Sequence, residues 1–275
     1  MKVCVAGLGH IGLPTALYVA NRGLKVFGYD ISEKAVAKAK SSGINALRNW
    51  ADVPPADFYM ICVSTFLKNN EPDLTPVFDV CEKIAEKAES ALISIESTVI
   101  PGTCRKINEN IFKGCAALVH VPHRYWIRDP IKRGVKQLRI IGGVNDVSLK
   151  RGVRFYRDQL NIPLHVASSI EVAEMSKIVE NAYRYLQIAF AEDLKMTCDE
   201  LQINFEEARK ACNTKWNVEI LEARKGIGGH CLPKDMEFFI SISPYNTILK
   251  SAVSVDNTYK KWLANKEKRH LIGNP

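Results

Sequence analysis

The sequence predicts an α/β protein in which a Rossmann-type, doubly wound sheet is followed by an all-helical domain with a long spine helix. Three observations predict this fold. Short apolar runs alternate with amphipathic stretches through the first half of the chain, which is typical of βαβ units. A glycine-rich turn follows the first apolar run. Beyond Ser169, apolar residues recur at helical spacing over roughly 30 residues.

The predicted strands are short, largely apolar runs at residues 2–6, 25–29, 58–63, 91–95, 116–121 and 138–141. Helices are predicted at 11–21, from a cap at Ser32 to about residue 40, and at 76–88. Because crossovers between parallel strands are right-handed, the C-termini of all strands should lie at one edge of the sheet. Ligands bind at that edge in open α/β sheets.

The second half of the chain is predicted to be helical. The spine helix should cover 170–201, and further helices should cover 205–212 and 246–266. The change in pattern places a domain boundary near Ala167, which gives a nucleotide-binding domain at 1–167 and a helical domain at 168–275. A length of 275 residues allows two such domains but not three large ones.

Thirty-eight basic and thirty acidic side chains give a net charge of +8, which favours anionic partners. The basic residues are densest at 124–157, where a solvated face or a site for a phosphorylated small molecule is favoured over nucleic acid, because no nucleic-acid-binding motif accompanies them. The eight cysteines form no CxxC pair, which indicates a reducing, cytoplasmic setting and no metal site. Residues 3–21 are too polar to span a membrane, and no targeting segment is expected.

Gly7, Gly9 and Gly12 form a GxGxxG motif directly after the first predicted strand. In a dinucleotide-binding turn the first glycine allows the tight turn, the second lets the backbone approach the pyrophosphate, and the third allows close packing of helix on strand. Backbone N–H groups at His10 and Ile11, where the helix starts, would then face the phosphates. The alternative is a structural glycine turn in a sheet that binds no nucleotide.

Asp30 closes the second predicted strand, eighteen residues after Gly12. Its carboxylate can accept hydrogen bonds from the ribose hydroxyls of the adenosine, and it would repel a 2′-phosphate. The cofactor that these residues predict is therefore NAD rather than NADP.

Two clusters in the second half carry candidate chemistry. Lys177 and Asn181 lie one helical turn apart, so an ammonium and an amide can meet one substrate oxygen or one water; the alternative is a solvated lysine beside a surface asparagine. Three glycines within 226–229 imply close backbone approach or unusual dihedral angles. Cys231, which follows them, is a candidate nucleophile, and Lys234 is a candidate for substrate binding. The alternative is a buried structural cysteine beside a turn.

The chain resembles the UDP-glucose/GDP-mannose dehydrogenases in seven segments that occur in order: GLGHIGLP, GYD, ICVST, PDLTPV, ESTVIPGT, AEMSKIVENAYR and GIGGHCLPKD. These NAD-dependent enzymes oxidise the C6 alcohol of a nucleotide sugar to a carboxylate, as a step of polysaccharide biosynthesis. The resemblance implies the same activity here, on a small anionic substrate (a sugar nucleotide or sugar phosphate), with no nucleic acid or membrane partner. Relatives dimerise through the helical region, and the long apolar spine helix fits a homodimer.

The resemblance also implies a role for each matching residue. Cys231 matches the nucleophile that captures the intermediate aldehyde as a thiohemiacetal, which becomes a thioester, so that one site performs two oxidations. Lys177 matches the lysine that stabilises the oxyanion at C6. Asn181 and Asp235 match the pair that holds a catalytic water, and Thr98 matches a threonine that contacts the same water.

On the cofactor side, Ser64 and Thr65 follow a strand at the ligand-binding edge of the sheet. Glu96 ends the next strand, where it would lie near the nicotinamide ribose. On the substrate side, the loop of Gly228 and Gly229 would lie against the sugar.

Two features depart from the family. Where the family usually has Pro-Glu, with a glutamate that assists thioester hydrolysis, this chain has His123. Histidine can act as a base near neutral pH, so hydrolysis either continues or is lost; Asp129 is a second candidate for that role. The family's third domain, which grips the nucleoside diphosphate, is not expected, since only nine residues follow Lys266. A natural short form, a partner chain or a fragment would each explain this.

Two other functions stay open from the sequence. A two-electron β-hydroxyacid dehydrogenase, acting on a smaller substrate, shares the two-domain plan and a similar Lys-xxx-Asn helix but needs no cysteine. An NAD-binding pseudoenzyme or regulatory chain would have lost the chemistry, although Lys177, Asn181, Cys231 and Asp235 are all present. The sequence does not identify the sugar or hydroxy acid.

Overall fold

The computed structural model of the chain describes residues 1–88, 90–124, 129 and 131–272. The chain divides into two compact units, Met1–Lys177 and Ile178–Pro275. The boundary between the units lies inside the long helix α6 (Ile170–Glu200), whereas the change in sequence pattern falls near Ala167.

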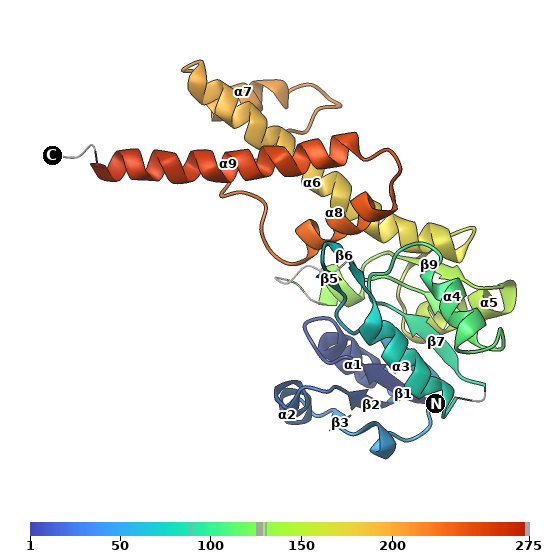
Figure 1. Cartoon of the computed structure of the whole chain (residues 1–275). Helices are drawn as coiled ribbons and strands as arrows, with labels where there is room; N and C mark the ends of the chain where they lie inside the picture. The colour runs from blue at the N-terminus through green and yellow to red at the C-terminus, as the bar shows by residue number, and fades with distance from the viewer. Residues whose placement is uncertain (89, 125–128, 130, 273–275) are drawn as a thin grey trace. The chain divides into compact units, whose positions relative to one another are not determined.

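The first unit is built on an eight-stranded sheet, counted over the described residues, in the order β10-β9-β8-β7-β4-β1-β2-β3 (Figure 1). The strands are β1 (Lys2–Ala6), β2 (Lys25–Tyr29), β3 (Asn45–Leu47), β4 (Phe58–Ile61), β7 (Leu92–Ile95), β8 (Ala117–His120), β9 (Arg139–Gly143) and β10 (Leu164–Val166). Pairing is parallel from β3 to β8, which confirms the predicted Rossmann-type sheet.

The strands at one edge of the sheet differ from the prediction. Strand β9 pairs with β8 in the antiparallel sense, and β10 runs parallel to β9. The expectation that all strand C-termini share one edge is therefore wrong for β9 and β10. A parallel pair needs a crossover, usually a helix, and the described residues between β8 and β9 supply only the short π-helical turn at Ile131–Val135.

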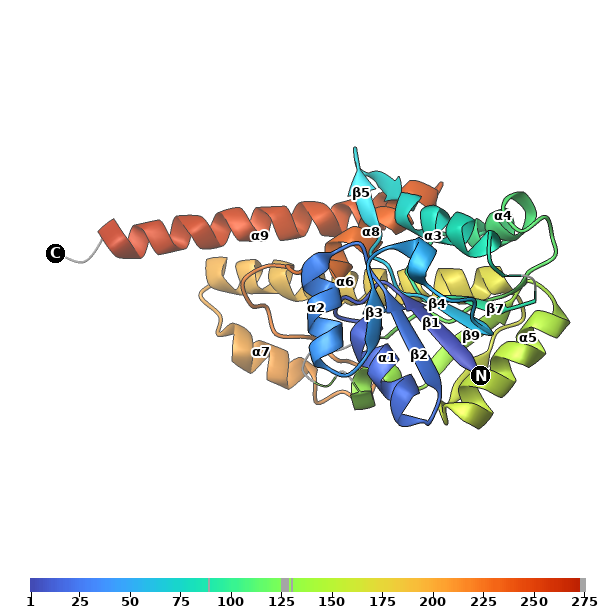
Figure 2. The same ribbon diagram turned by 90° about the horizontal axis from the view of Figure 1, so that it is seen from below.

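Helices cover both faces of the sheet. Successive side chains of each strand point to opposite faces, and apolar side chains on both faces are buried in two core clusters. Val5 of β1 faces the layer of α1, α2 and α5, and Ala6 faces the layer of α3 and α4. Figure 2 shows the two layers on either side of the strands. The helices are α1 (Gly12–Asn21), α2 (Glu33–Ser41), α3 (Thr75–Ala85), α4 (Thr103–Asn110) and α5 (Asp146–Val153).

Several short elements of the first unit are not predicted by the sequence pattern. Helix α4 has eight residues with the polar sequence TCRKINEN, which is too short for helical periodicity to stand out. The hairpin of β5 (Phe66–Lys68) and β6 (Glu71–Asp73) turns at Asn69 and Asn70, with φ of 54° and 62°. Two positive φ values are what a tight two-residue hairpin turn requires, and asparagine tolerates them.

The second unit is helical, as predicted. Beyond α6 it contains α7 (Phe205–Cys212), α8 (Cys231–Ile242) and α9 (Thr247–Ile272). Helix α8 is not predicted from the sequence; it carries Pro233 in its first turn, where proline removes no helical hydrogen bond. Tyr185 of α6, Met236 of α8 and Leu249 of α9 share one core cluster. None of the helices in the described residues combines the length and the apolar character that crossing a membrane requires.

Candidate active site

The turn between β1 and α1 requires glycine at two of its three glycine positions. Gly7 has a φ of +88°, in the left-handed region that favours glycine, and a Cβ there would lie 2.7 Å from the carbonyl carbon of Cys62. A Cβ at Gly12 would lie 1.7 Å from the carbonyl oxygen of Gly7. The tight turn and the close packing of helix on strand therefore account for these two glycines.

Gly9 is different, because no described atom lies within 4 Å of the Cβ that a larger residue would place there. Neither packing nor a left-handed backbone requires this glycine. At the start of α1, which no described side chain caps, His10 is exposed and Ile11 is half-buried. Open space beside the backbone and uncapped N–H groups are what a pyrophosphate needs at this position.

Asp30 is held in place by two backbone groups. Its Oδ2 accepts a hydrogen bond from the Leu8 N–H at 2.7 Å, and its Oδ1 accepts one from the Ser32 N–H at 2.8 Å. Each carboxylate oxygen keeps a lone pair for a ribose hydroxyl. In the loop after β4, at the same edge of the sheet, Ser64 is exposed and Thr65 is buried.

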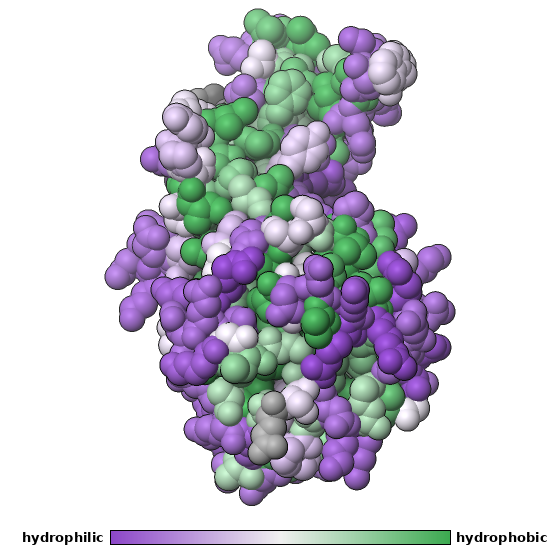
Figure 3. Space-filling view, turned by 90° about the vertical axis from the view of Figure 1, so that its right-hand side faces the viewer, coloured by the Kyte–Doolittle hydropathy of each residue, from purple (hydrophilic) through white to green (hydrophobic). Residues whose placement is uncertain are grey.

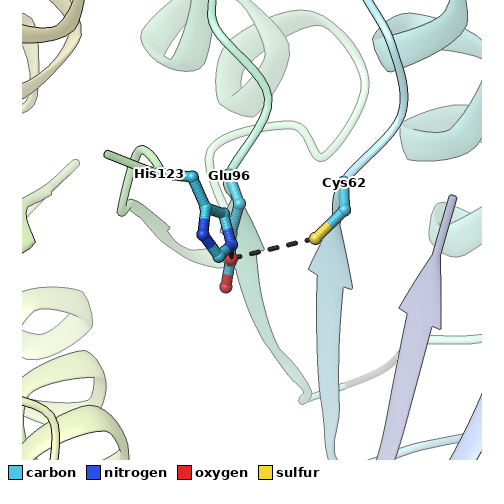
Figure 4. Close-up of side chains that lie close together, drawn as sticks. All are labelled: Cys62, Glu96 and His123. Atoms are coloured by element: carbon cyan, nitrogen blue, oxygen red, sulfur yellow. Dashed lines mark hydrogen bonds and ion pairs between the residues drawn. The ribbon is translucent and has the colours of Figure 1, made fainter. Parts of the chain in front are cut away.

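Glu96, just past β7, is the centre of a buried polar cluster (Figure 4). Its Oε2 accepts a hydrogen bond from Arg139 Nη2 at 2.9 Å and contacts His123 Nε2. Its Oε1 accepts a hydrogen bond from the Tyr156 hydroxyl. The side chains of Glu96 and Arg139 are fully buried, and that of His123 is 2% exposed. Figure 4 shows the Cys62 thiol pointing at the same carboxylate, with Sγ 3.8 Å from Oε2.

The charges of this Glu96 cluster are set by burial and by Arg139. Burial penalises the charge of Glu96, but the guanidinium of Arg139, followed by His123, outweighs that penalty and lowers the pKa of Glu96 to about 2. Burial, together with the charge of Arg139, lowers the pKa of His123 to about 4. Near pH 7, Glu96 is therefore ionised and paired with Arg139, and His123 is neutral.

Two predicted site residues lie inside this cluster. The carboxylate of Glu96, expected near the nicotinamide ribose, is buried and bound by Arg139, Tyr156 and His123. His123, expected as a base, is neutral at pH 7, but its Nε2 is committed to Glu96, and no described residue hydrogen-bonds its Nδ1. Asp129, the second candidate for that role, accepts a hydrogen bond from the Lys132 N–H at 3.0 Å.

Arg139 and Tyr156 contact the predicted site residue Glu96 but are not predicted from the sequence. The only signal for Arg139 is a basic residue at the start of the apolar run RIIGG. Tyr156 lies in the π-helical turn η3 (Arg154–Gln159) that continues α5, and its hydroxyl also contacts Ser94 Oγ at 2.7 Å. A π-helical turn leaves no sequence pattern, although such turns are frequent at functional sites.

Cys62, Glu96 and His123 are also a candidate set of metal ligands, since one donor atom of each lies within 4.8 Å of the others. Thiolate, carboxylate and imidazole are the ligands that zinc prefers. The guanidinium of Arg139, however, already neutralises Glu96 at 2.9 Å and would repel a divalent cation. We therefore assign the cluster to internal support of the sheet edge.

In the second unit, Cys231 is exposed and begins α8, where the N–H groups of the first helical turn stabilise negative charge. Asp235, one turn later, is buried, and its Oδ2 accepts a hydrogen bond from the amide of Asn181 on α6. Its Oδ1 accepts one from Lys234 Nζ at 2.5 Å. The structure thus brings Asn181 and Asp235 together, and it buries Lys234 against Asp235.

The glycine loop before Cys231 has open space beside it. No described atom lies within 4 Å of a Cβ on Gly228 or Gly229, and Gly229 has a φ of +79°. A cavity of about 360 Å³ is lined in part by Gly228. Its charged lining is net cationic and consists of Arg184, Arg209, Arg224, Glu219 and Glu222.

Lys177 and Thr98, the remaining predicted residues, belong to the first unit. Lys177 is half-buried on α6, four residues before Asn181, and its charge contributes to the lowered pKa of His123. Thr98 is half-buried in the loop after β7.

Two family models match the chain. The model of the NAD binding domain of the UDP-glucose/GDP-mannose dehydrogenase family matches residues 1–49 and 45–160. The model of the central domain of the same family matches residues 171–258. The prediction of NAD as the cofactor is thereby confirmed, and the glycine turn at Gly7, Gly9 and Gly12 lies within an NAD-binding domain.

Curated relatives include the UDP-N-acetyl-D-mannosamine dehydrogenase of Methanococcus vannielii, 33% identical over 96% of this chain and 67% of that protein. The enzyme of that name from Methanococcus maripaludis is 35% identical over 87% of this chain and 61% of that protein. A solved UDP-D-ManNAc dehydrogenase from Pyrococcus horikoshii has a TM-score of 0.89 at 28% identity, over 99% of this chain and 72% of that one. The chain thus spans about two thirds of the length of these relatives. It belongs to the UDP-glucose/GDP-mannose dehydrogenase family.

Proposed function

We propose that the chain catalyses the NAD-dependent oxidation of a primary alcohol on a nucleotide-linked sugar to the carboxylate, through Cys231. The observation that carries this proposal lies in the second unit. There an exposed cysteine begins a helix and follows a glycine loop with open space, and Asp235, one turn later, is hydrogen-bonded to Asn181 of α6. Membership of the dehydrogenase family, with its NAD-binding domain, supports the redox class.

The first unit supplies the cofactor site in this proposal. Uncapped N–H groups at the start of α1 and the open backbone at Gly9 would hold the pyrophosphate. Asp30, already oriented by Leu8 and Ser32, would bind the ribose hydroxyls. NAD, when bound, accepts hydride from the carbon that is oxidised.

The chain's own groups carry the remaining chemistry. Lys177 would stabilise the oxyanion that develops at C6 while the alcohol is oxidised to the aldehyde. Cys231 Sγ then adds to the aldehyde carbon as a thiolate and forms a thiohemiacetal, whose loss of a second hydride leaves a thioester. Water attacks the thioester carbon, the carbon–sulfur bond breaks, and the thiol returns with release of the carboxylate. Four electrons leave the sugar as two hydrides.

Asp235 and Asn181 are proposed to hold the attacking water. Asn181 and Lys234 each donate to a different oxygen of Asp235, which leaves lone pairs on both oxygens for a water. Lys234 thereby orients Asp235, and Thr98 is proposed for water binding as well. This proposal gives His123 no part in water activation, because its Nε2 contacts Glu96 inside the buried cluster.

The proposed substrate is a UDP-linked N-acetylated hexosamine, the class named for the relatives. Three arginines line the cavity beside Gly228 and can contact a phosphate-bearing molecule; of these, Arg209 also pairs with Glu206 and Arg224 with Glu222. The test compares kcat/KM for UDP-N-acetylmannosamine, UDP-glucose and GDP-mannose, each with NAD and with NADP. The kcat/KM for UDP-N-acetylmannosamine with NAD should be the highest, by about tenfold or more. No reduced cofactor from any combination would contradict the proposed function.

We also propose a homodimer through the outer face of α6. Val179, Tyr183 and Phe190 lie on one side of this helix at spacings of four and seven residues. Tyr183 and Phe190 are each 60% exposed. Figure 3 shows hydrophobic side chains at the surface of the helical unit. Exposed aromatic side chains gathered on one stripe are typical of protein interfaces.

The variant with Tyr183→Asp and Phe190→Asp should be a monomer at micromolar concentration, because buried charges at an interface are costly. Sedimentation equilibrium should give a mass near twice 30.8 kDa for the unchanged chain and near 30.8 kDa for this variant. Ile31→Asp, at an apolar residue of the first unit that is 74% exposed, is the matched control and should leave the dimer intact. A monomeric unchanged chain would refute the dimer.

A further inference from the structure

The segment that leads into the glycine loop is attached to helix α9. The hydroxyl of Tyr259 donates a hydrogen bond to the carbonyl oxygen of Arg224 at 2.8 Å. Lys260 Nζ donates one to the carbonyl oxygen of Ile227 at 2.7 Å. The N–H of Ile227 donates in turn to Asp256 Oδ1 at 2.8 Å. Three residues on adjacent turns of α9 thus bind the backbone of residues 224–227.

Asp256 is a rigid acceptor within this attachment. The residue is buried, and its Oδ2 accepts hydrogen bonds from the Tyr185 hydroxyl at 2.9 Å and from Lys260 Nζ at 2.7 Å. A buried carboxylate with three donors, one of them cationic, is strongly fixed in position. Tyr185 belongs to α6, so the acceptor for Ile227 is tied to two helices of the unit.

The side chain of Lys260 packs directly against Gly226. Gly226 has a φ of +86°, and a Cβ there would lie 2.6 Å from Cε and 2.7 Å from Cγ of Lys260. The stem of Lys260 therefore lies across the glycine before its ammonium reaches Ile227 and Asp256. A side chain at position 226 would strain the backbone and displace that stem at the same time.

The open part of the loop lies between this attachment and the candidate nucleophile. Gly228 and Gly229, which have no described atom within 4 Å of an added Cβ, separate Ile227 from the start of α8 at Cys231. We propose that Asp256 and Lys260 are positioning residues that fix the glycine loop, and through it the Cys231 thiol, for the reaction. The catalytic consequence rests on the proposed function; the attachment itself does not.

Loss of this attachment should act on kcat more than on KM. The thiol must meet a carbon within about 3–3.5 Å, and a misplacement of about 1 Å can cost on the order of 100-fold in rate. Lining residues of the cavity on other elements, such as Arg184 and Arg209, stay in place, so KM should change less than kcat. A residue that only stabilised the fold would instead lower activity in step with the unfolded fraction.

Helix α9 offers a matched control. Lys266 forms an ion pair with Asp199 of α6, as Lys260 does with Asp256, and the two lysine side chains are 41% and 43% exposed. Removing Lys266 therefore deletes an ion pair of an equally exposed lysine from the same helix, and it leaves the attachment at Ile227 in place; its partner Asp199 is 41% exposed, whereas Asp256 is 3% exposed.

The test compares Lys260→Ala, Lys266→Ala, Asp256→Ala and Asp256→Asn in the full chain. It measures hydrogen exchange at the Ile227 amide, kinetics with UDP-N-acetylmannosamine and NAD, and urea unfolding. Lys260→Ala should speed exchange at Ile227 and lower kcat by about tenfold or more, with KM within about threefold. Lys266→Ala should leave both unchanged. Asp256→Asn keeps an acceptor for the Ile227 N–H and should retain slower exchange and a higher kcat than Asp256→Ala.

The proposal is overturned if Lys260→Ala behaves like Lys266→Ala in exchange and in kcat. It is equally overturned if both quantities change only as far as the loss of global stability requires. Should Asp256→Ala fail to fold, Lys260→Ala decides the matter, because the buried Asp256 then keeps the Tyr185 hydroxyl and the Ile227 N–H as donors. Absent turnover in the unchanged chain would contradict the proposed function, and exchange at Ile227 would then test the attachment alone.

Discussion

Cys231→Ala should lower the rate of carboxylate formation by on the order of 10³-fold or more, the scale seen when a covalent nucleophile is removed. The proposed reaction reaches the second oxidation only through the bond between Cys231 Sγ and the aldehyde carbon. Without that bond the aldehyde stage has no thiohemiacetal to oxidise and no thioester to hydrolyse. Following product by mass spectrometry and NADH by absorbance measures both stages in one experiment.

Cys212→Ala is the matched control for this prediction. Cys212 is also an exposed cysteine of the second unit, at the end of α7, but it has no glycine loop before it and no described partner pair beside it. The Cys212→Ala variant should form carboxylate as fast as the unchanged chain does. If Cys231→Ala forms carboxylate as fast as Cys212→Ala does, the covalent route is wrong.

Gly12→Ala should mainly destabilise the fold, whereas Gly9→Ala should mainly weaken cofactor binding. A Cβ at Gly12 would lie 1.7 Å from the carbonyl oxygen of Gly7, and neither backbone can move aside. We expect Gly12→Ala to destabilise the first unit by more than about 4 kcal/mol, a loss reserved for severe clashes. At Gly9 no described atom lies within 4 Å, so Gly9→Ala should change the free energy of unfolding by less than about 1 kcal/mol.

The same methyl group at Gly9 would occupy the space proposed for the pyrophosphate. Gly9→Ala should therefore raise the Kd for NAD by about tenfold or more, about 1.4 kcal/mol, while the protein stays folded. Isothermal titration with NAD and thermal unfolding of both variants measure the two effects separately. NAD affinity unchanged in Gly9→Ala would place the cofactor elsewhere, and a stable Gly12→Ala would contradict the packing argument.

Features with a local pattern could be predicted from the sequence. Strands β1 and β2 have the predicted bounds, because a short apolar run between turn residues is itself the signal. The glycine turn and Asp30 can be recognised together, since their spacing follows from one βαβ unit. Asn181 and Asp235 lie in separate segments of the sequence. Only the resemblance to a family predicts that the two side chains act as a pair.

Features that depend on distant parts of the chain could not be predicted. Arg139 meets Glu96 across 43 residues, and the attachment of Ile227 to Asp256 spans 29. Neither pairing leaves a spacing that a single sequence could reveal. Glu192 on α6 is a further example: it is buried, and burial, together with the charge of Asp256, raises its pKa to about 7. The helical period predicts which side of α6 is buried and apolar. It does not predict that a carboxyl group, that of Glu192, is buried there as well.

The most direct measurement of the proposed function is the number of NADH molecules formed per sugar nucleotide consumed, run to completion with the unchanged chain. Oxidation of an alcohol to a carboxylate releases two hydrides, so UDP-N-acetylmannosamine should yield two NADH and one uronate. A ratio of one NADH, with an aldehyde or ketone as the product, would contradict the Cys231 mechanism and favour a two-electron dehydrogenase.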